Sequence, residues 1–333
     1  MEIKTESREI YKVQFINKSM EKQKEIYFET EFVGQKQGFN EVPTGYIDKT
    51  ICGCGLTSVA LENNIDTIIA VPSVALVMNK VNQYPNERFS GVIFGVYGGI
   101  DAEDINEYVS RVDSYRGTLK IMVTYDSLYK VEHLLNRCRL IIDESQAILK
   151  LKKLKLKNKD NKDVCTYLLD IAHRYKDTTS FISATPIPLN YLPEWLSEIP
   201  QYKFHFSHVT KVQPLLMKRT YPYKSLEDEI IRPLKDSDSV TIGNRTFSKV
   251  IVFINSVSNI LKIIKECLLN KDDVAILCGD NQRNDIKIKG YNRIDNPCNL
   301  PKYTFITSSG FEGIDLIDHE AINIVVSNTS KEH

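Results

Sequence analysis

Short apolar runs that alternate with amphipathic stretches constrain this 333-residue chain more than any other feature of its sequence. Runs rich in β-branched residues occur at Thr67–Val71, Gly91–Val96, Lys120–Val123, Leu140–Ile142 and Ser180–Ile182. Amphipathic stretches lie between them, for example Asp101–Tyr115 and Val164–Tyr175. Apolar runs of this length are typical of parallel strands that helices bury on both faces. The alternation therefore predicts a doubly wound α/β domain.

A second series of the same kind begins near Lys249 and predicts a second domain. Its expected elements are strands at Lys249–Ile254, Asp273–Cys278, Lys302–Thr307 and Ala321–Val326, with a helix at Ser256–Leu269. Two domains also agree with a chain longer than one core usually organises. We expect a lead-in at residues 1–40 with strands at Tyr11–Ile16 and Ile26–Val33, a first domain at 41–210, a linker at 211–245 and a second domain at 246–333.

The balance of charge limits the partners of the chain. Lys and Arg number 43 and Asp and Glu also number 43, so a uniformly basic coat for nucleic acid is excluded, whereas a local basic groove is not. No apolar run is long enough for a membrane span, and the N-terminal residues lack the apolar core of a secretory signal. We therefore expect a cytoplasmic protein without a membrane partner.

The strongest local motif is Leu140-Ile-Ile-Asp-Glu-Ser-Gln146, an apolar strand that ends in two acids. Doubly wound folds bind their ligands at the carboxyl edge of the sheet, where this strand would place Asp143 and Glu144. In nucleotide hydrolases an Asp at this position holds Mg²⁺, and the Glu orients and deprotonates the attacking water. Ser183-Ala-Thr-Pro186 follows another apolar strand of the same domain, which strengthens the interpretation.

Upstream, Thr50-Ile-Cys-Gly-Cys-Gly-Leu-Thr-Ser58 precedes an apolar helical stretch. A phosphate-binding loop needs glycines that let backbone N–H groups approach the phosphates, then a helix and a hydroxyl for Mg²⁺. Gly53, Gly55 and Thr57 fit these requirements, but Leu56 stands where a lysine should precede the hydroxyl. The alternative interpretation is a tight glycine turn that caps a helix.

With these three motifs the sequence resembles the superfamily 2 helicases, the DEAD/DEAH-like group of two tandem RecA-like domains. Weaker matches are Val71-Pro-Ser73, Thr124-Tyr-Asp-Ser127, Val252–Ser256, Ile276–Asp280 and Thr307–Asp315. The resemblance covers about residues 40–333 and implies an α/β fold of two parallel sheets with an interdomain cleft. The degenerate phosphate loop also resembles helicases of phages and mobile elements, which would place the protein in a host cytoplasm.

The resemblance also implies roles for individual residues, with ATP and Mg²⁺ as the bound cofactors. Residues implied in nucleotide binding are Gly53, Cys54, Gly55, Leu56, Thr57, Ser58, Gly313 and Asp315, and those implied in metal binding are Thr57 and Asp143. Glu144 would be the general base and Gln146 would link the γ-phosphate to the second domain, while Ser183 and Thr185 would couple hydrolysis to domain motion. The residues that would contact the nucleic-acid backbone are Pro72, Ser73, Thr124 and Thr307.

Two departures from the family pattern affect the expected activity. Leu56 removes the cation that neutralises the β- and γ-phosphates, and we predict that Lys49, seven residues earlier, lies near the loop and supplies part of this charge. The alternative is that Leu56 packs and the pocket binds ATP poorly. The arginine-rich sixth motif has no match before His333, so the sequence is a piece of a longer protein or lacks that motif.

We therefore expect an ATP-dependent helicase or translocase that acts on nucleic acid, with DNA favoured over RNA. The alternative is a helicase-fold protein with weakened catalysis that acts as a nucleic-acid-binding or scaffolding module. A small-molecule kinase of the phosphate-loop type would leave the second strand–helix series and Thr307–Asp315 unexplained.

Overall fold

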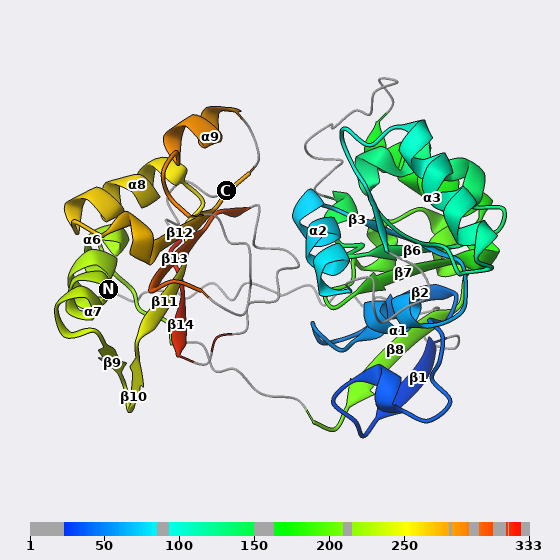
Figure 1. Ribbon diagram of the computed structural model, residues 1–333. Helices are drawn as coiled ribbons and strands as arrows, with labels where there is room; N and C mark the ends of the chain where they lie inside the picture. Colours follow the sequence, from blue (N-terminus) through cyan, green and yellow to red (C-terminus); the bar gives the residue numbers. More distant parts are fainter. Residues whose placement is uncertain are drawn as a thin grey trace, which may run out of the picture.

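The structure is a computed structural model that describes residues 23–84, 93–149, 163–208, 215–279, 282–292, 300–308, 318 and 320–327. Figure 1 shows two α/β units, each built on a sheet of parallel strands. The first sheet contains β1 (Gln23–Phe28), β2 (Gly45–Asp48), β3 (Thr67–Val71), β4 (Phe94–Val96), β5 (Lys120–Thr124), β6 (Arg139–Asp143), β7 (Thr179–Ser183) and β8 (Gln201–Phe206). Its order is β1-β8-β2-β7-β6-β3-β5-β4, and every neighbouring pair is parallel.

Helices cover both faces of this sheet, which explains why its central strands, such as β3, are fully buried and rich in apolar residues. They are α1 (Leu56–Glu62), α2 (Val74–Gln83), α3 (Ala102–Ser114) and α5 (Val164–Arg174). Ile68 and Ala70 of β3 belong to the apolar cluster that contains α3 and α5. Ile69 and Val71 belong to the cluster that contains α1 and α2. Alternate residues of one strand therefore stabilise opposite layers.

The starts of the longer helices follow from short polar side chains in the sequence. Ser73 caps α2, Asp101 caps α3 and Asp163 caps α5, and in each case the side chain accepts a hydrogen bond from a backbone N–H of the first turn. Short 3₁₀ turns lie at Val33–Gln35, Tyr125–Lys130, Glu132–Leu134, Lys176–Thr178, Leu189–Tyr191 and Glu194–Ser197. These turns and helices connect the strands without a long irregular loop in the described part of this unit.

The second sheet contains β11 (Lys249–Phe253), β12 (Val274–Leu277), β13 (Tyr303–Ile306) and β14 (Ala321–Val325) in the parallel order β12-β13-β11-β14. Its helices are α8 (Val257–Glu266), which Ser256 caps, and α9 (Gln282–Lys287), with a 3₁₀ turn at Lys271–Asp273. The two series of strands expected from the sequence are thus both present, and both form parallel sheets.

Residues 211–245, expected to be a linker, contain ordered structure in their described part. A continuous helical segment runs through α6 (Pro222–Leu226), a π-helical stretch (Glu227–Ile231) and α7 (Arg232–Ser237), and β9 (Val240–Ile242) pairs with β10 (Arg245–Phe247). Leu226, Ile231 and Leu234 are buried in the apolar cluster of the second sheet. Ion pairs such as Lys224–Asp228 and Arg232–Asp228 lie on the outer face of the helix. The mixed charge of the segment conceals this apolar stripe in the sequence.

Two strands of the first sheet differ from the sequence expectation. The strand expected at Ile26–Val33 is found at Gln23–Phe28, and as β1 it pairs with β8 inside the first sheet. The sequence analysis did not anticipate β8, in which polar residues such as Gln201, Lys203 and His205 interrupt the apolar run. The strand expected at Tyr11–Ile16 lies outside the described residues. Among the described helices, none combines the length and the apolar composition that a membrane span requires.

Candidate functional site

The first candidate site lies where β2, β7 and β6 end side by side. The three strands are adjacent and parallel, so the residues that follow them share one edge of the sheet. Asp143 ends β6, Ser183 ends β7 and Lys49 follows β2. Asp143 is 7% exposed, and the Tyr125 hydroxyl donates a hydrogen bond of 2.5 Å to its backbone oxygen. The sequence predicted the acidic pair at the carboxyl end of a central parallel strand, and the structure has it there.

The expected phosphate loop reaches this edge through one hydroxyl. Thr57, in the first turn of α1, donates from Oγ1 to Oδ2 of Asp143 over 2.8 Å. Gly53 and Gly55 have φ angles of 71° and 80°, a left-handed conformation that favours glycine, and Gly55 caps α1. A glycine turn ahead of a helix is thus present, with its hydroxyl directed at the first acid.

Other residues assigned to the loop point elsewhere. Leu56 is only 2% exposed and packs in the apolar cluster with Val59 and Ala60. Cys54 is buried in the same cluster, and burial raises the pKa of its thiol, so it remains protonated at neutral pH. Ser58 lies against the hydroxyl of Tyr84. The structure therefore brings Thr57 to the acidic pair, whereas the side chains of Leu56 and Cys54 belong to the core.

A lysine from outside the loop contacts the acidic pair. Lys49 is 6% exposed, and its Nζ lies 3.3 Å from Oδ1 of Asp143 and 3.1 Å from Oε1 of Glu144. Burial acts to lower the pKa of Lys49, but the attraction of the two carboxylates is larger and the pKa is raised. Lys49 is thus a charged ammonium, and it partly offsets the charge of the buried Asp143 and the half-buried Glu144.

The second acid is linked to the Ser183-Ala-Thr185 segment by hydrogen bonds. Nε2 of Gln146 donates to Oε2 of Glu144, and Oγ of Ser183 donates to Oε1 of Gln146 over 2.6 Å. The backbone N–H of Thr185 then donates to Oγ of Ser183 over 2.9 Å. The expected catalytic residues therefore form one connected chain across the ends of β6 and β7.

Two residues of this edge have a strained backbone. Thr50 and Glu144 have φ angles of 55° and 56°, although neither is a glycine. Such conformations cost on the order of 1 kcal/mol or more and persist where the surroundings fix them. The Thr50 N–H donates to Asp48, and its hydroxyl donates to the backbone oxygen of Phe204. The strain turns the chain sharply after each strand, so that Lys49 and Glu144 face the same space.

The donor set at this edge suits a hard divalent cation that is shared with a phosphate. Mg²⁺ is usually held by one or two carboxylate or hydroxyl oxygens, with its remaining positions taken by water and substrate oxygens. Thr57 Oγ1 and Asp143 Oδ2 provide two such oxygens 2.8 Å apart. Within the described residues no group of three or more His, Cys, Asp and Glu could hold a metal by itself. Thr57 and Asp143 could therefore contribute two ligands to a metal whose other ligands come from water or substrate.

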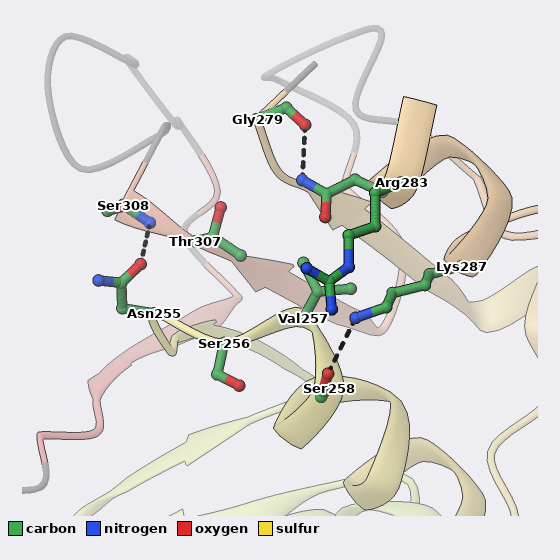
Figure 2. Close-up of a pocket in the computed structure, with 10 residues that line it drawn as sticks. Asn255, Ser256, Val257, Ser258, Gly279, Arg283, Lys287, Thr307 and Ser308 are labelled. Atoms are coloured by element: carbon green, nitrogen blue, oxygen red, sulfur yellow. Dashed lines mark hydrogen bonds between the residues drawn. The ribbon is translucent and has the colours of Figure 1, made fainter. Parts of the chain in front are cut away.

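A second candidate site is a pocket at the carboxyl edge of the second sheet, with a volume of about 540 Å³. Its lining residues are Asn255, Ser256, Val257, Ser258, Gly279, Arg283, Asn284, Lys287, Thr307 and Ser308. Figure 2 shows the side chains of Arg283 and Lys287 extending from α9 toward the first turn of α8, where Lys287 donates to Ser258 over 3.1 Å. The described residues that line the pocket include hydroxyls, amides and two cations but no acid. The sequence analysis assigned no role to either cation because α9 matches no motif.

The residues expected to contact nucleic acid lie at the carboxyl edges of both sheets. Pro72 and Ser73 follow β3, with the Ser73 hydroxyl engaged as the cap of α2. Thr124 ends β5 and is buried, and its hydroxyl has no hydrogen-bond partner among the described residues. Thr307 follows β13 and lines the pocket that contains Arg283 and Lys287, called the basic pocket below. Gly313 and Asp315 lie outside the described residues.

Comparison with solved structures shows where this fold is found. The two parallel sheets have the arrangement of the tandem RecA-like domains of a solved helicase, which confirms the fold class expected from the sequence. The helicase Lhr of Mycobacterium smegmatis, solved with single-stranded DNA and AMP-PNP, matches 90% of this chain with a TM-score of 0.53 and 14% identity. The match covers 46% of the Lhr chain, so this chain spans less than half the length of that protein.

Two further structures show a weaker similarity. Dbp5 of S. cerevisiae, solved with RNA and ADP BeF3, matches 82% of this chain and 68% of its own at 14% identity and a TM-score of 0.45. A DEAD box protein from the hyperthermophile Methanococcus jannaschii matches 84% of this chain and 74% of its own at 15% identity and a TM-score of 0.36. No protein-family model matches the sequence, and no curated protein sequence matches it.

Proposed function

We propose that this protein is an ATP-dependent helicase or translocase that hydrolyses ATP at the edge of the first sheet. The observation that carries the proposal is the connected set of side chains at the ends of β6 and β7. Thr57 contacts Asp143, and the next residue, Glu144, is linked through Gln146 to Ser183. A hydroxyl, two acids and an amide in this order suit metal-assisted phosphoryl transfer to water.

Each side chain has a chemical role in this proposal. Thr57 and Asp143 would hold Mg²⁺, which supplies positive charge to the phosphate oxygens when it is bound. Glu144 would orient the attacking water and accept its proton through a carboxylate oxygen. Gln146 touches both Glu144 and Ser183, so a change at the γ-phosphate would reach Ser183 and the Thr185 N–H through hydrogen bonds. The proposed catalytic residues thereby communicate with the segment that leaves β7.

The basic pocket would bind phosphates of the nucleic-acid backbone. Arg283 and Lys287 supply positive charge, and Thr307 adds a residue that the sequence already suggested for this role. The pocket also lies at the first turn of α8, where backbone N–H groups favour anions. Contacts to phosphate and sugar carry no base information, so we expect binding that is largely independent of sequence.

Changes in the first site would alter the grip of the second through relative motion of the two domains. In this proposal the first domain comprises residues 41–210 and the second residues 246–333, and the nucleotide-binding roles of Gly313 and Asp315 rest on the family resemblance alone. Lhr, which has this fold, was solved with single-stranded DNA and AMP-PNP, a pair of ligands that agrees with the two proposed sites. We propose DNA as the preferred nucleic acid.

The test is ATP hydrolysis measured alone, with single-stranded DNA and with single-stranded RNA. The proposal expects turnover that one of the two nucleic acids stimulates. A protein that binds nucleic acid but neither binds nor hydrolyses ATP would instead be a helicase-fold binding or scaffolding module. The buried position of Leu56 favours this second function, because the loop then lacks a lysine at its usual place. If the wild type hydrolysed ATP faster than the Glu144→Gln variant, a function as a binding or scaffolding module without hydrolysis would be excluded.

A further inference from the structure

The one described lysine that contacts the acidic pair lies before the loop and not inside it. Lys49 follows β2, and its ammonium contacts both Asp143 and Glu144. Leu56, at the usual position of the phosphate-binding lysine, is 2% exposed and packs against the core. A lysine at position 56 would have to leave that cluster to reach a phosphate. The chain thus has a cation at position 49, beside the acids, and a core residue at position 56.

We propose that Lys49 binds the terminal phosphates of the nucleotide and that, until a nucleotide is bound, it also restrains the proposed general base. This inference rests on the proposed ATP site and names the residue that recognises the phosphates. Without nucleotide, Oε1 of Glu144 accepts a hydrogen bond from Lys49 and Oε2 accepts one from Gln146. Both oxygens of the base are therefore engaged. Phosphate binding would draw Lys49 away and release one of them.

The main chain around Lys49 is fixed, so only its side chain needs to move. The Lys49 N–H donates to the backbone oxygen of Ser183 over 2.8 Å, and its own carbonyl accepts from Ile51 over 2.6 Å. Thr50 is anchored on both sides, through its N–H to Asp48 and through its hydroxyl to Phe204. A lysine side chain carries its charge on a flexible stem of four carbons. Rotation of that stem moves the ammonium while β2 and β7 stay in register.

The distances allow such a movement. Nζ of Lys49 lies 3.3 Å from Oδ1 of Asp143, while the other oxygen of the same carboxylate is 2.8 Å from Oγ1 of Thr57. One carboxylate thus separates the ammonium from the hydroxyl that would share the metal with the phosphates. A triphosphate with several negative charges attracts an ammonium more strongly than a single carboxylate does at the same distance. The incoming phosphates therefore compete successfully with Glu144 for Lys49.

The resting contacts form a closed ring, which explains how phosphate binding would be sensed. Lys49 contacts Glu144, Glu144 accepts from Gln146, Gln146 accepts from Ser183, and the carbonyl of Ser183 accepts from the backbone of Lys49. Withdrawal of the ammonium opens this ring at one position only. The site therefore changes from a restrained to a competent state when, and only when, a phosphate replaces Glu144 as the partner of Lys49.

The proposal is tested by nucleotide binding to variants of the full chain. Lys49→Met should weaken binding of fluorescent Mg²⁺–ATP about tenfold or more while leaving adenosine binding unchanged, because only the phosphates lose a charged partner. Lys49→Arg should restore part of the affinity. Lys203→Met, which removes a lysine from the neighbouring strand β8, is the matched control and should bind as the wild type does. Equal ATP affinity in Lys49→Met and in the wild type would overturn the proposal.

A second measurement uses the wild-type protein, so it does not depend on the variant folding. An ATP acyl phosphate transfers its acyl group to a lysine amine beside the terminal phosphates and releases ATP. Mass spectrometry should find the acyl group on Lys49, and excess Mg²⁺–ATP should prevent the labelling. Labelling of other lysines with Lys49 unmodified would reject the assignment. A wild type that binds no nucleotide in either experiment would overturn the proposed function itself, a different outcome from the loss of the Lys49 role alone.

Discussion

The carboxyl edges of the two sheets differ in both charge and burial. At the first edge, Lys49 and Asp143 are 6% and 7% exposed, and their charges are paired with each other. At the second edge, Arg283 is exposed and lines an open pocket with Lys287. Buried charges must be balanced in place, whereas exposed cations remain accessible to an extended anion. The difference agrees with the proposed roles, ATP hydrolysis at the first edge and binding of a polyanion at the second.

The packing of the two sheets shows a parallel difference. The first sheet contributes alternate residues to two large apolar clusters, one on each face. The second sheet has one large apolar cluster on one face. Among the described residues, the cluster on its other face is small, and its buried members are Ile251, Leu300 and Ile306. A sheet held from both faces keeps strand ends in fixed register, which a catalytic site requires. Binding of a flexible backbone tolerates a less enclosed sheet.

The largest expected effect is at the first edge. Glu144→Gln should reduce ATP hydrolysis about 10³-fold, because it removes the proposed base while keeping the volume of the side chain. Nucleotide binding should persist. Steady-state turnover and equilibrium binding measure the two quantities separately, and Glu107→Gln on the exposed face of α3 is the control. Unchanged turnover in Glu144→Gln would show that the catalytic role of the first edge is misassigned.

The next effect is at the second edge. The double substitution Arg283→Ala and Lys287→Ala should weaken binding of single-stranded nucleic acid about 10²-fold, with a shallower dependence on salt, because two phosphate partners are lost. Binding titrations at several salt concentrations give both values. Lys265→Ala, an exposed lysine of α8, should leave affinity unchanged. If the double variant lost ATP binding but kept nucleic-acid binding, the assignment of ATP to the first edge and of nucleic acid to the second would be wrong.

A smaller effect is expected on stability, where the buried cation Lys120 should make the free energy of unfolding depend on pH and an exposed lysine should not. Lys120 donates to Ala60, Asn63 and Ile65, and burial lowers the pKa of its ammonium from 10.5 to about 8. Between these pH values the unfolded chain binds more protons than the folded one, so the free energy of unfolding rises with pH. The wild type should therefore gain about 2 kcal/mol relative to Lys120→Met from pH 8 to pH 10.5.

Denaturant unfolding at several pH values measures this gain. The exposed residue Lys176 provides the control, since Lys176→Met should follow the wild type throughout. A constant difference between the wild type and Lys120→Met would contradict the lowered pKa of Lys120.

The smallest effect concerns one hydroxyl of the basic pocket. Thr307→Val keeps the shape of a side chain that is 6% exposed and should weaken nucleic-acid binding about fivefold, equivalent to about 1 kcal/mol for one hydrogen bond. The same titration detects it, and ATP binding in the absence of nucleic acid serves as the internal control. An effect as large as that of the double substitution would mean that the hydrogen bond of the Thr307 hydroxyl, and not the charge of Arg283 and Lys287, dominates recognition of the ligand.

The sequence by itself determined the two parallel sheets and the position of the acidic pair. A buried parallel strand needs a continuous apolar run, so β3 is found where the sequence predicted it, at Thr67–Val71. Asp143 and Glu144 were placed correctly because a strand that ends in acids has its carboxylates at the sheet edge. These features depend on local pattern, which a single sequence displays.

Only the tertiary structure decided what depends on neighbours distant in sequence. The polar strand β8 forms because it lies between β1 and β2, and the helix at 222–237 is held by the second sheet. The pairing of Lys49 with Glu144 joins residues that are 95 positions apart. Whether a lysine faces solvent or an acid depends on which strands are adjacent, and that order is set by the packing of the whole sheet. The sequence suggested Lys49 as a replacement for the missing lysine at position 56, and the fold set its partners, because β2 lies beside β7 and β7 beside β6, the strand that ends in Asp143.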